Sequence, residues 1–403
     1  MKIRKSSIAA AVATLAAGSM LAVSTPAIAN TPTLTVWYPD DKKATYVDVI
    51  TAWGKENNVN VTLVARSFGT VRDLLKTAVP AGTGPDVLVG AAHDWTGSLV
   101  SAAVVRPISL SSQITSGLTP NSVSAFAINN RQYGVPAYTE NLAFIRNVKK
   151  APKPVAKLSS IKNGELAVPY GVTGGDAYHF YPLQTAFDAP VLVPKSNGFS
   201  STLGMTGTNG ENFAKFLNRG SKFFGNGGYG QLCDFINGKI KYWITGPWNI
   251  KNIQEGAAAC KTGLKLGSGY SIDAFPAGPN GVKGVPFLGA KGSFLTNSPQ
   301  TDVVNSMRLI NFLASKEAGI AFFNAEYAAP ANKAALEVAS NDAAIRAFAA
   351  VGEKVRPMPN IVAMDSIWDK WGKTQAKLLT GKSTNPAADW KAMTDSIKES
   401  LKG

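Results

Sequence analysis

After residue 30, the spacing of apolar residues changes repeatedly between that of a β-strand and that of an α-helix. Residues 34–38 form a short run that is apolar on nearly both faces, which predicts a buried strand. Apolar residues in 44–53 and in 71–78 recur at helical spacing, whereas those in 59–63 alternate and those in 86–89 are continuous. Strand, helix, strand, helix, strand at this spacing predicts right-handed parallel crossovers and a sheet covered by helices.

Units of the same kind recur later in the chain. Residues 167–169 and 242–245 are predicted to be short buried strands. Ser298, Pro299 and Asp302 carry a cap residue, a proline and an early acid, which together predict the start of a helix near Ser298. No fixed-period repeat is present, so a repeat architecture is not expected.

The connections and the last helix follow from turn and cap chemistry. Asn385-Pro386 is expected to open a terminal helix, because asparagine caps helices well and proline suits the first helical position. The Gly- and Ser-rich residues 197–210 are expected to form a surface loop, and so are residues 276–284.

The N-terminus predicts a secretory signal peptide over residues 1–29. Three of the first five residues are basic, residues 8–23 are apolar or small, and residues 26–29 offer a small-x-small cleavage site. The apolar run is too short for a comfortable membrane span, and no later segment is expected to cross a membrane. The mature protein is therefore expected to be exported and soluble, in a periplasm or outside the cell. No lipid anchor is expected, because no cysteine lies near residue 29.

The charge changes this interpretation little. The formal net charge is +15 at pH 7, of which three charges belong to the predicted signal peptide. The lysines are spread along the chain, and no arginine-rich run or basic-aromatic RNA motif is present. A basic solvated surface is therefore favoured over nucleic-acid binding.

Two cysteines remain in a chain that is expected to reach an oxidising compartment. Cys233 and Cys260 are the natural partners for a single disulfide there. Their spacing is far from C-x-x-C, so a structural bridge is expected rather than a redox site.

Signatures of catalysis and of metal binding are largely missing. The chain has no G-x-S-x-G elbow and no H-E-x-x-H, and its P-loop-like endings at 381–383 and 284–291 lack the required spacing. With only His93 and His179, a histidine-rich metal site is excluded and a Ser-His-Asp triad is unsupported. No catalytic residue, metal site or cofactor is predicted. A glycosidase needs only two carboxylates, so that alternative stays open.

Seven segments stand out when they are taken in order. They are residues 36–42, 84–88, His93-Asp94, 134–136 with Glu140, 237–239, Thr245-Gly246-Pro247-Trp248, and 358–361 leading to Trp368. Together they resemble the maltose/maltodextrin-binding proteins, which are extracellular solute-binding proteins of carbohydrate ABC importers. The segments Gly-Pro-Trp and Met-Pro-Asn-Ile weigh most in this resemblance.

This resemblance implies an α/β fold of two doubly wound lobes with a hinge, like the type II periplasmic binding proteins. Residues 30–138 with 282–329 would form one lobe, and residues 139–281 with 330–403 the other. The segment Tyr138–Glu140 would be the hinge. The resemblance also implies a monomer that closes on an oligosaccharide and presents it to the transmembrane permease subunits of an importer.

The resemblance also assigns a sugar site. A pyranose has an apolar C–H face, which aromatic rings cover, and a rim of hydroxyls, which carboxylates and amides bind. Trp248, Trp368 and Tyr178 match the stacking rings of the family, and Trp371, three residues after Trp368, is expected to be core. The expected polar ligands are Asp41, Lys42, Asp94, Glu140 and, with a looser match, Asp176. Trp95 is added because it follows Asp94, where the family can have arginine.

Departures from the family leave the sugar open. Residues 90–92 are Gly-Ala-Ala where maltose-binding proteins often carry a tryptophan, so the wall of the first lobe differs. Maltose or maltodextrin is the leading ligand. Trehalose, sucrose or another oligosaccharide is the alternative, and a secreted glycoside-acting enzyme is the alternative from another class.

Overall fold

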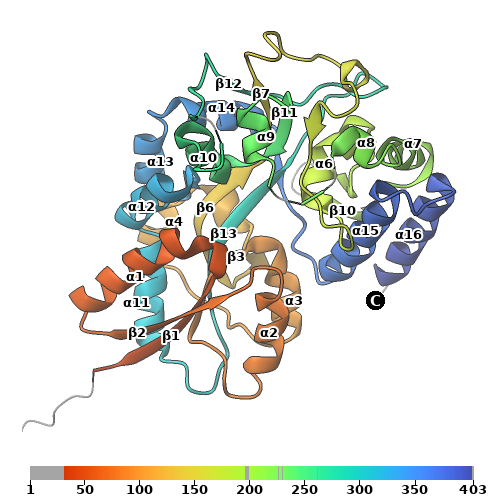
Figure 1. Cartoon of the computed structure of the whole chain (residues 1–403). Helices are drawn as coiled ribbons and strands as arrows, with labels where there is room; N and C mark the ends of the chain where they lie inside the picture. Colours follow the sequence, from red (N-terminus) through yellow and green to blue (C-terminus); the bar gives the residue numbers. More distant parts are fainter. Residues whose placement is uncertain (1–30, 196–198, 226, 229, 261, 402–403) are drawn as a thin grey trace, which may run out of the picture. The chain divides into compact units, whose positions relative to one another are not determined.

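The computed structural model describes residues 31–195, 199–225, 227–228, 230–260 and 262–401. The predicted signal peptide, residues 1–29, lies outside the described residues. Everything below concerns the part of the chain from Pro32 onward, which is one compact unit. Its two larger sheets are the centres of two lobes, which we call the first and the second lobe (Figure 1).

The first lobe contains a seven-stranded sheet of order β14-β6-β13-β3-β1-β2, with β15 also paired to β13. β1 pairs in parallel with β2 and β3, as predicted, whereas β13 runs antiparallel to both β3 and β6. The strands are β1 Thr33–Pro39, β2 Asn60–Arg66, β3 Val87–Ala92, β6 Gly134–Asn141, β13 Phe287–Leu295, β14 Ala329–Pro330 and β15 Arg356–Pro357.

Both faces of this sheet are buried, which explains the nearly continuous apolar run in β1. Leu34 and Val36 belong to one apolar core and Trp37 belongs to another on the opposite face. α1 buries Tyr46 and Ile50 in the first of these cores. The helices of this lobe are α1 Lys43–Glu56, α2 Val71–Ala78, α3 Thr96–Ser101, α4 Ser112–Gly117, α5 Pro120–Ser124, α11 Val303–Leu313, α12 Lys316–Glu326 and α13 Lys333–Ala339, with the single turns η1 Asp40–Lys42 and η2 His93–Trp95 and the small hairpin β4 Ala127–Ile128 and β5 Arg131–Gln132.

The second lobe contains a four-stranded sheet of order β12-β7-β11-β8. Successive residues of β11, Trp243 and Ile244, again enter two different cores. The strands are β7 Ala143–Asn147, β8 Leu166–Ala167, β11 Tyr242–Thr245 and β12 Tyr270–Asp273, and a separate ribbon is formed by β9 Leu192–Pro194 and β10 Phe199–Leu203. The helices are α6 Ala177–Ala186, α7 Gly207–Leu217, α8 Ser221–Phe224, α9 Leu232–Ile236, α10 Ile250–Glu255, α14 Ala343–Val351, α15 Met364–Leu379 and α16 Pro386–Ser400, with the turns η3 Leu158–Ser160 and η4 Pro247–Asn249.

The chain passes between the sheets at the end of β6. The expected hinge, Tyr138–Glu140, lies inside β6, where Tyr138 is paired on one side with Lys291 and on the other with Pro330. The ladder ends at Asn141, and β7 of the second sheet begins at Ala143. Strand pairing is therefore interrupted at Leu142, and the hinge at Tyr138–Glu140 stays a prediction.

The chain passes between the lobes again near α13. This helix packs against α12 and β14 of the first lobe, whereas α14 packs against β12 of the second. The lobe boundary at residues 329 and 330 stays a prediction; in the structure the packing partner changes between Ala339 and Ala343.

Two local predictions were wrong. The helix expected from Ser298 begins at Val303, because the carboxylate of Asp302 accepts a hydrogen bond from the Asn305 N–H and caps the helix there. Residues 197–210 are not a loop throughout: β10 occupies Phe199–Leu203 and α7 begins at Gly207, while residues 197 and 198 lie outside the described residues. By contrast, Asn385 caps α16 as predicted.

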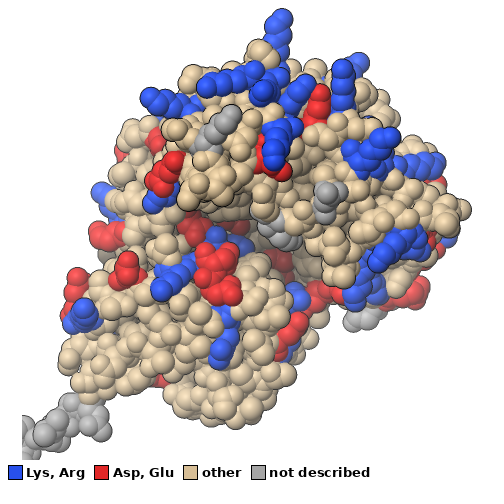
Figure 2. Space-filling view, in the orientation of Figure 1, with Lys and Arg blue, Asp and Glu red and all other residues tan. Residues whose placement is uncertain are grey.

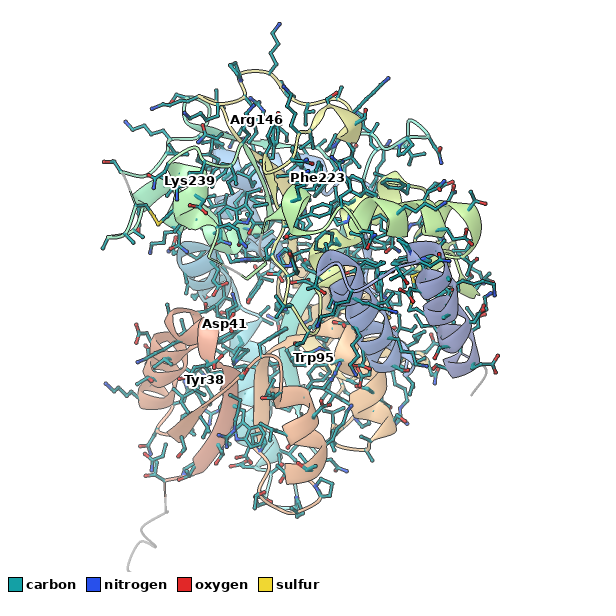
Figure 3. All side chains as sticks on the ribbon, turned by 45° about the vertical axis from the view of Figure 1, so that its right-hand side comes forward. Tyr38, Asp41, Trp95, Arg146, Phe223 and Lys239 are labelled. Atoms are coloured by element: carbon teal, nitrogen blue, oxygen red, sulfur yellow. A yellow bond between two sulfur atoms is a disulfide. The ribbon has the colours of Figure 1, made fainter. Side chains whose placement is uncertain are left out.

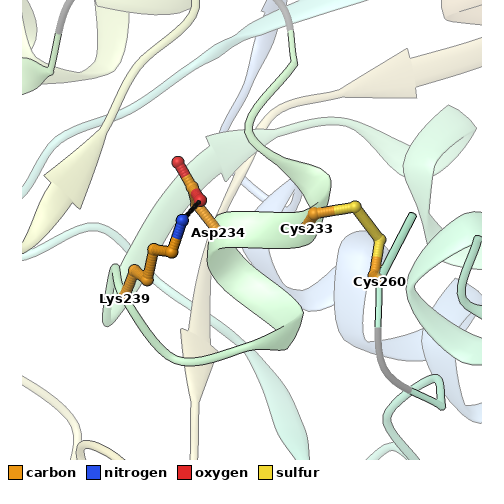
Figure 4. The surroundings of a disulfide bond; sticks show 4 residues. All are labelled: Cys233, Asp234, Lys239 and Cys260. Atoms are coloured by element: carbon orange, nitrogen blue, oxygen red, sulfur yellow. Dashed lines mark ion pairs between the residues drawn. A yellow bond between two sulfur atoms is a disulfide. The ribbon is translucent and has the colours of Figure 1, made fainter.

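The expected disulfide joins Cys233 of α9 to Cys260, which follows α10 (Figure 4). It ties α9 to the segment that follows α10, and the adjacent Asp234 pairs with Lys239 at 2.8 Å. No helix within the described ranges is long and apolar enough to cross a membrane.

Candidate functional site

Five of the predicted site residues lie just after strands of the two main sheets. Asp41 and Lys42 stand on η1 after β1, Asp94 and Trp95 stand on η2 after β3, and Trp248 stands on η4 after β11. Carboxyl ends of strands are the usual binding edge of doubly wound sheets. A hollow opens in the middle of the face seen in Figure 2, with acidic and basic side chains at its rim. Figure 3 labels Asp41 and Trp95 on the first lobe and Phe223 and Lys239 on the second.

A tryptophan of the second lobe is hydrogen-bonded to a carboxylate of the first. The indole Nε1 of Trp368, on α15, donates to Oδ2 of Asp94 at 2.9 Å. Trp368 is half-buried and stacks on Trp371, with ring centroids 5.2 Å apart and planes 8° apart. Trp371 is fully buried and donates to Gln184, so it is the core residue of the pair, as predicted. The Trp368 ring is therefore held on one face by Trp371 and at its Nε1 atom by Asp94.

The loop before α6 lies close against α15. A Cβ at Gly175 would lie 2.2 Å from the carbonyl oxygen of Gly372, and Gly175 has a positive φ of 62°. Only glycine fits such an approach in that conformation without strain. This contact brings Asp176 and Tyr178 beside the helix that carries Trp368.

The Tyr178 hydroxyl lies close to β6 and β13. A Cβ at Gly289 would lie 3.4 Å from both the Tyr178 hydroxyl and a carboxylate oxygen of Glu140, so the missing side chain leaves room for both groups. The Tyr178 hydroxyl is buried and has no hydrogen-bond partner within the described part of the chain. Burial, reinforced by the charges of Glu140, Asp176 and Asp94, holds the pKa of Tyr178 well above its usual value. The hydroxyl therefore stays a neutral donor at physiological pH.

Lys42 is held in an ion pair inside the first lobe. Its ammonium lies 2.6 Å from Glu326 Oε2, and Thr45 donates to the other oxygen of Glu326. Burial alone would lower the pKa of Lys42, but the carboxylates of Glu326, Glu140 and Asp41 together raise it. Lys42 is therefore charged at neutral pH. Asp41 is more exposed, and its carboxylate lies 3.7 Å from the same ammonium.

Trp248 lies beside a histidine that the sequence analysis did not assign to the site. The Trp248 ring folds over Gly246, where a Cβ would lie 2.1 Å from it. His179 meets the Trp248 ring edge to face, with centroids 6.0 Å apart and planes at 86°. Asp176 caps α6 through the His179 backbone N–H and also accepts from His179 Nδ1 at 2.8 Å.

Trp95 is placed differently from the other predicted residues. It is 6% exposed and packs in a core of the first lobe against Phe68, with centroids 4.9 Å apart. Lys291 lies 4.2 Å above Phe68 and 3.6 Å from Glu140, so Phe68 and Lys291 link the Trp95 ring to Glu140. Its indole supports the wall of the site.

Three of these neighbours could not be assigned from the sequence. Glu326 is on α12 and Lys291 is in β13, each far along the chain from its partner. His179 is on α6, three residues from Asp176 but far along the chain from Trp248. The sequence offers one signal for two of them: Glu326 and Lys291 each stand within an apolar run. A charged side chain in such a run is expected to have a partner, because charges are rarely buried unpaired.

Within the described residues, no group of three or more His, Cys, Asp or Glu is arranged to hold a metal ion. Half-buried rings beside paired charges suit a neutral, hydroxyl-rich ligand.

Comparison with known proteins agrees with this architecture. The sequence model of the bacterial extracellular solute-binding proteins matches residues 48–349. A galactooligosaccharide-binding protein of Bacillus subtilis is 26% identical, over 92% of this chain and 89% of that protein. A maltooligosaccharide ABC transporter solute-binding lipoprotein of Streptococcus pneumoniae is also 26% identical, over 92% of this chain and 89% of its own length.

The fold has solved counterparts. The maltotriose-binding protein of Thermus thermophilus, solved with maltotriose, superposes with a TM-score of 0.78 at 22% identity, over 91% of this chain and all of that chain. It has the two-lobe type II fold that the resemblance implied. The match over residues 48–349 and this shared fold lead to one assignment: the chain belongs to the family of bacterial extracellular solute-binding proteins.

Proposed function

We propose that the protein is the exported sugar receptor of an ABC importer and that it binds a maltodextrin-like oligosaccharide between its lobes. The observation that carries this proposal is the meeting of Trp368 with Asp94, which joins an aromatic platform of one lobe to a carboxylate of the other. In this proposal Trp248, Trp368 and Tyr178 cover the apolar faces of successive glucose units.

The polar groups bind the hydroxyl rim. Asp94 Oδ1 and the Tyr178 hydroxyl are buried and lack hydrogen-bond partners among the described residues, so each gains a full hydrogen bond from a sugar hydroxyl. Glu140, Lys42 and Asp41 bind hydroxyls from the first lobe. Asp176 acts next to Tyr178, and Trp95 supports the wall behind Asp94.

The remaining parts of the proposal rest on the family and its relatives. Members of this family are binding proteins, and one relative is named as part of an ABC transporter, which supports permease subunits as partners and binding without chemistry as the function. The extracellular character of the family supports export of this chain into a periplasm or to the cell exterior. In this proposal the exported protein acts as a monomer. The relatives' names support both maltooligosaccharides and galactooligosaccharides as candidate ligands, with maltooligosaccharides the first choice.

The test is a thermal-shift and calorimetry panel on the purified protein. Maltose, maltotriose, galactooligosaccharides, trehalose and sucrose are compared, and maltotriose is expected to raise the Tm and to bind near 1 μM, about −8 kcal/mol. Chromatography of the incubated sugar is expected to show maltotriose intact. A panel in which no sugar raises the Tm would contradict a carbohydrate receptor, and cleavage products would indicate an enzyme instead.

A further inference from the structure

The two histidines of the chain have opposite hydrogen-bond settings. In His93, Nε2 lies 3.1 Å from the Met358 carbonyl oxygen, which can only accept, so Nε2 carries the hydrogen. Nδ1, which lies 3.1 Å from the Ala290 backbone nitrogen and 3.3 Å from its carbonyl oxygen, then accepts the Ala290 N–H. In His179, Nδ1 lies 2.8 Å from the Asp176 carboxylate, which when ionised can only accept. His179 therefore carries its hydrogen on Nδ1.

His179 is also the contact between the two aromatic rings at this end of the site. Its ring meets Trp248 at 6.0 Å and 86°, and meets Tyr178 at 5.5 Å and 88°. The His179 side chain is about nine-tenths buried, so rotation of the imidazole would disturb both neighbours. Asp176 is in turn fixed by the first turn of α6, where it accepts the His179 backbone N–H.

From this arrangement we infer that Asp176 and His179 form a positioning pair that sets the orientation of the Trp248 indole and so determines how tightly the site holds its sugar. The inference rests on the proposed function, because it assumes that Trp248 stacks on the ligand. Asp176 fixes which ring nitrogen carries hydrogen and the rotation of the imidazole, as carboxylates do for metal-bound histidines. The imidazole then holds the indole by an edge-to-face contact.

One substitution separates this role from helix capping. Asp176→Ser keeps an N-cap oxygen for α6 but is too short to hold Nδ1 of His179. The matched control is Asp342→Ser, at the N-cap of α14, where, within the described part of the chain, the carboxylate accepts hydrogen bonds from the backbone N–H groups of Ala344 and Ile345 and from no side chain. We expect Asp176→Ser to weaken maltotriose binding about tenfold and Asp342→Ser to leave that affinity unchanged.

Two further variants test whether the pair acts as a unit. His179→Phe keeps an aromatic ring against Trp248 but has no nitrogen for Asp176, and it is also expected to weaken binding about tenfold. The double variant is expected to bind no more weakly than either single variant, because residues that act as one unit are non-additive. Affinity in Asp176→Ser equal to that of Asp342→Ser would overturn the inference.

A measurement without sugar keeps the inference separate from the proposed function. Because the chain has only His93 and His179, ¹⁵N-histidine labelling gives two ring systems, assigned with His179→Phe. We expect Nδ1 protonated in His179 and Nε2 protonated in His93, and we expect Asp176→Ser to change the His179 pattern alone. The Trp248 emission, taken as the difference from Trp248→Phe, is expected to change with it. If the wild type bound no sugar, these signals would still test the pair; Nε2 protonation in wild-type His179 would refute it.

Discussion

The hydrogen bond from Trp368 Nε1 to Asp94 Oδ2, 2.9 Å long, joins two residues 274 positions apart that belong to different lobes. Asp365, one turn earlier on α15, is bound by Arg72 at 2.5 Å and by Lys76 at 2.7 Å, both from α2 of the first lobe. The inner side of α15 packs in the core of the second lobe through Ile367 and Trp371. The N-terminal half of α15 is therefore the element through which the two lobes touch beside the proposed site.

This bond predicts a coupling between Asp94 and Trp368. Asp94→Ala should weaken maltotriose binding by ~2 kcal/mol, roughly thirtyfold, because a buried charge-assisted hydrogen bond is lost. Trp368→Phe, which keeps a ring but removes the N–H, should cost less than Trp368→Ala. Calorimetry on the single and double variants checks this, and additive losses would mean that the two side chains act independently.

The two roles proposed for tryptophan can be separated by substitution. Trp248→Ala should reduce the affinity for maltotriose by ~2 kcal/mol while the protein stays folded, since the ring is half-buried at the end of a strand. Trp371→Ala should instead cost ~3–5 kcal/mol of unfolding free energy, because that ring is fully buried. Denaturant titration and calorimetry distinguish the outcomes; the reverse pattern would exchange the two assignments.

Removing the disulfide should lower stability without moving the site. The bridge closes a loop of 27 residues, for which loop-closure entropy predicts ~3.5 kcal/mol in the double variant Cys233→Ser/Cys260→Ser. Urea unfolding of the oxidised protein and of the variant measures the difference. Maltotriose affinity should stay the same, because neither cysteine contacts a proposed ligand residue among the described residues.

Burial of His93 predicts how stability depends on pH. Burial lowers the pKa of His93 below its usual 6.5, so the folded state holds the ring neutral while the unfolded state binds a proton in acid. The contribution of neutral His93 to the free energy of unfolding is therefore complete above about pH 6.5 and falls as the pH drops below that value. The variant His93→Gln should have a flatter curve of unfolding free energy between pH 7 and pH 5. If the wild type and His93→Gln had the same slope of unfolding free energy against pH, other groups would be responsible for the pH dependence.

Closure around the sugar should be visible in solution. Maltotriose should reduce the radius of gyration measured by small-angle scattering, since contacts from both lobes exist together only in a closed state. Asp41→Ala should reduce the affinity with little change in Tm, because the Asp41 side chain is 56% exposed. Lys42→Ala should lower the Tm as well, since Glu326 is then left buried without its cation. An unchanged radius at proven saturation would exclude lobe closure.

Many local features could be predicted from sequence because they depend on neighbours along the chain. The strand over residues 34–38, the helix with Tyr46 and Ile50, and the cap at Asn385 follow from period and cap chemistry. The cap of α11 was assigned four residues too early, because Ser298 is also a good cap residue and only the folded chain shows that Asp302 takes that role. The disulfide pairing followed because only two cysteines exist.

The sequence by itself determined the alternation of elements, the pairing of the cysteines and, through ordered segments such as Gly246-Pro247-Trp248, the family. Tertiary structure alone decided which charges meet. Glu326 reaches Lys42 across 284 positions, Lys291 reaches Glu140, and Trp95 packs in a core of the first lobe against Phe68. Periodicity reports which face of an element is apolar, but the partner of a buried charge depends on how separate elements pack, and that is fixed only when the whole chain folds.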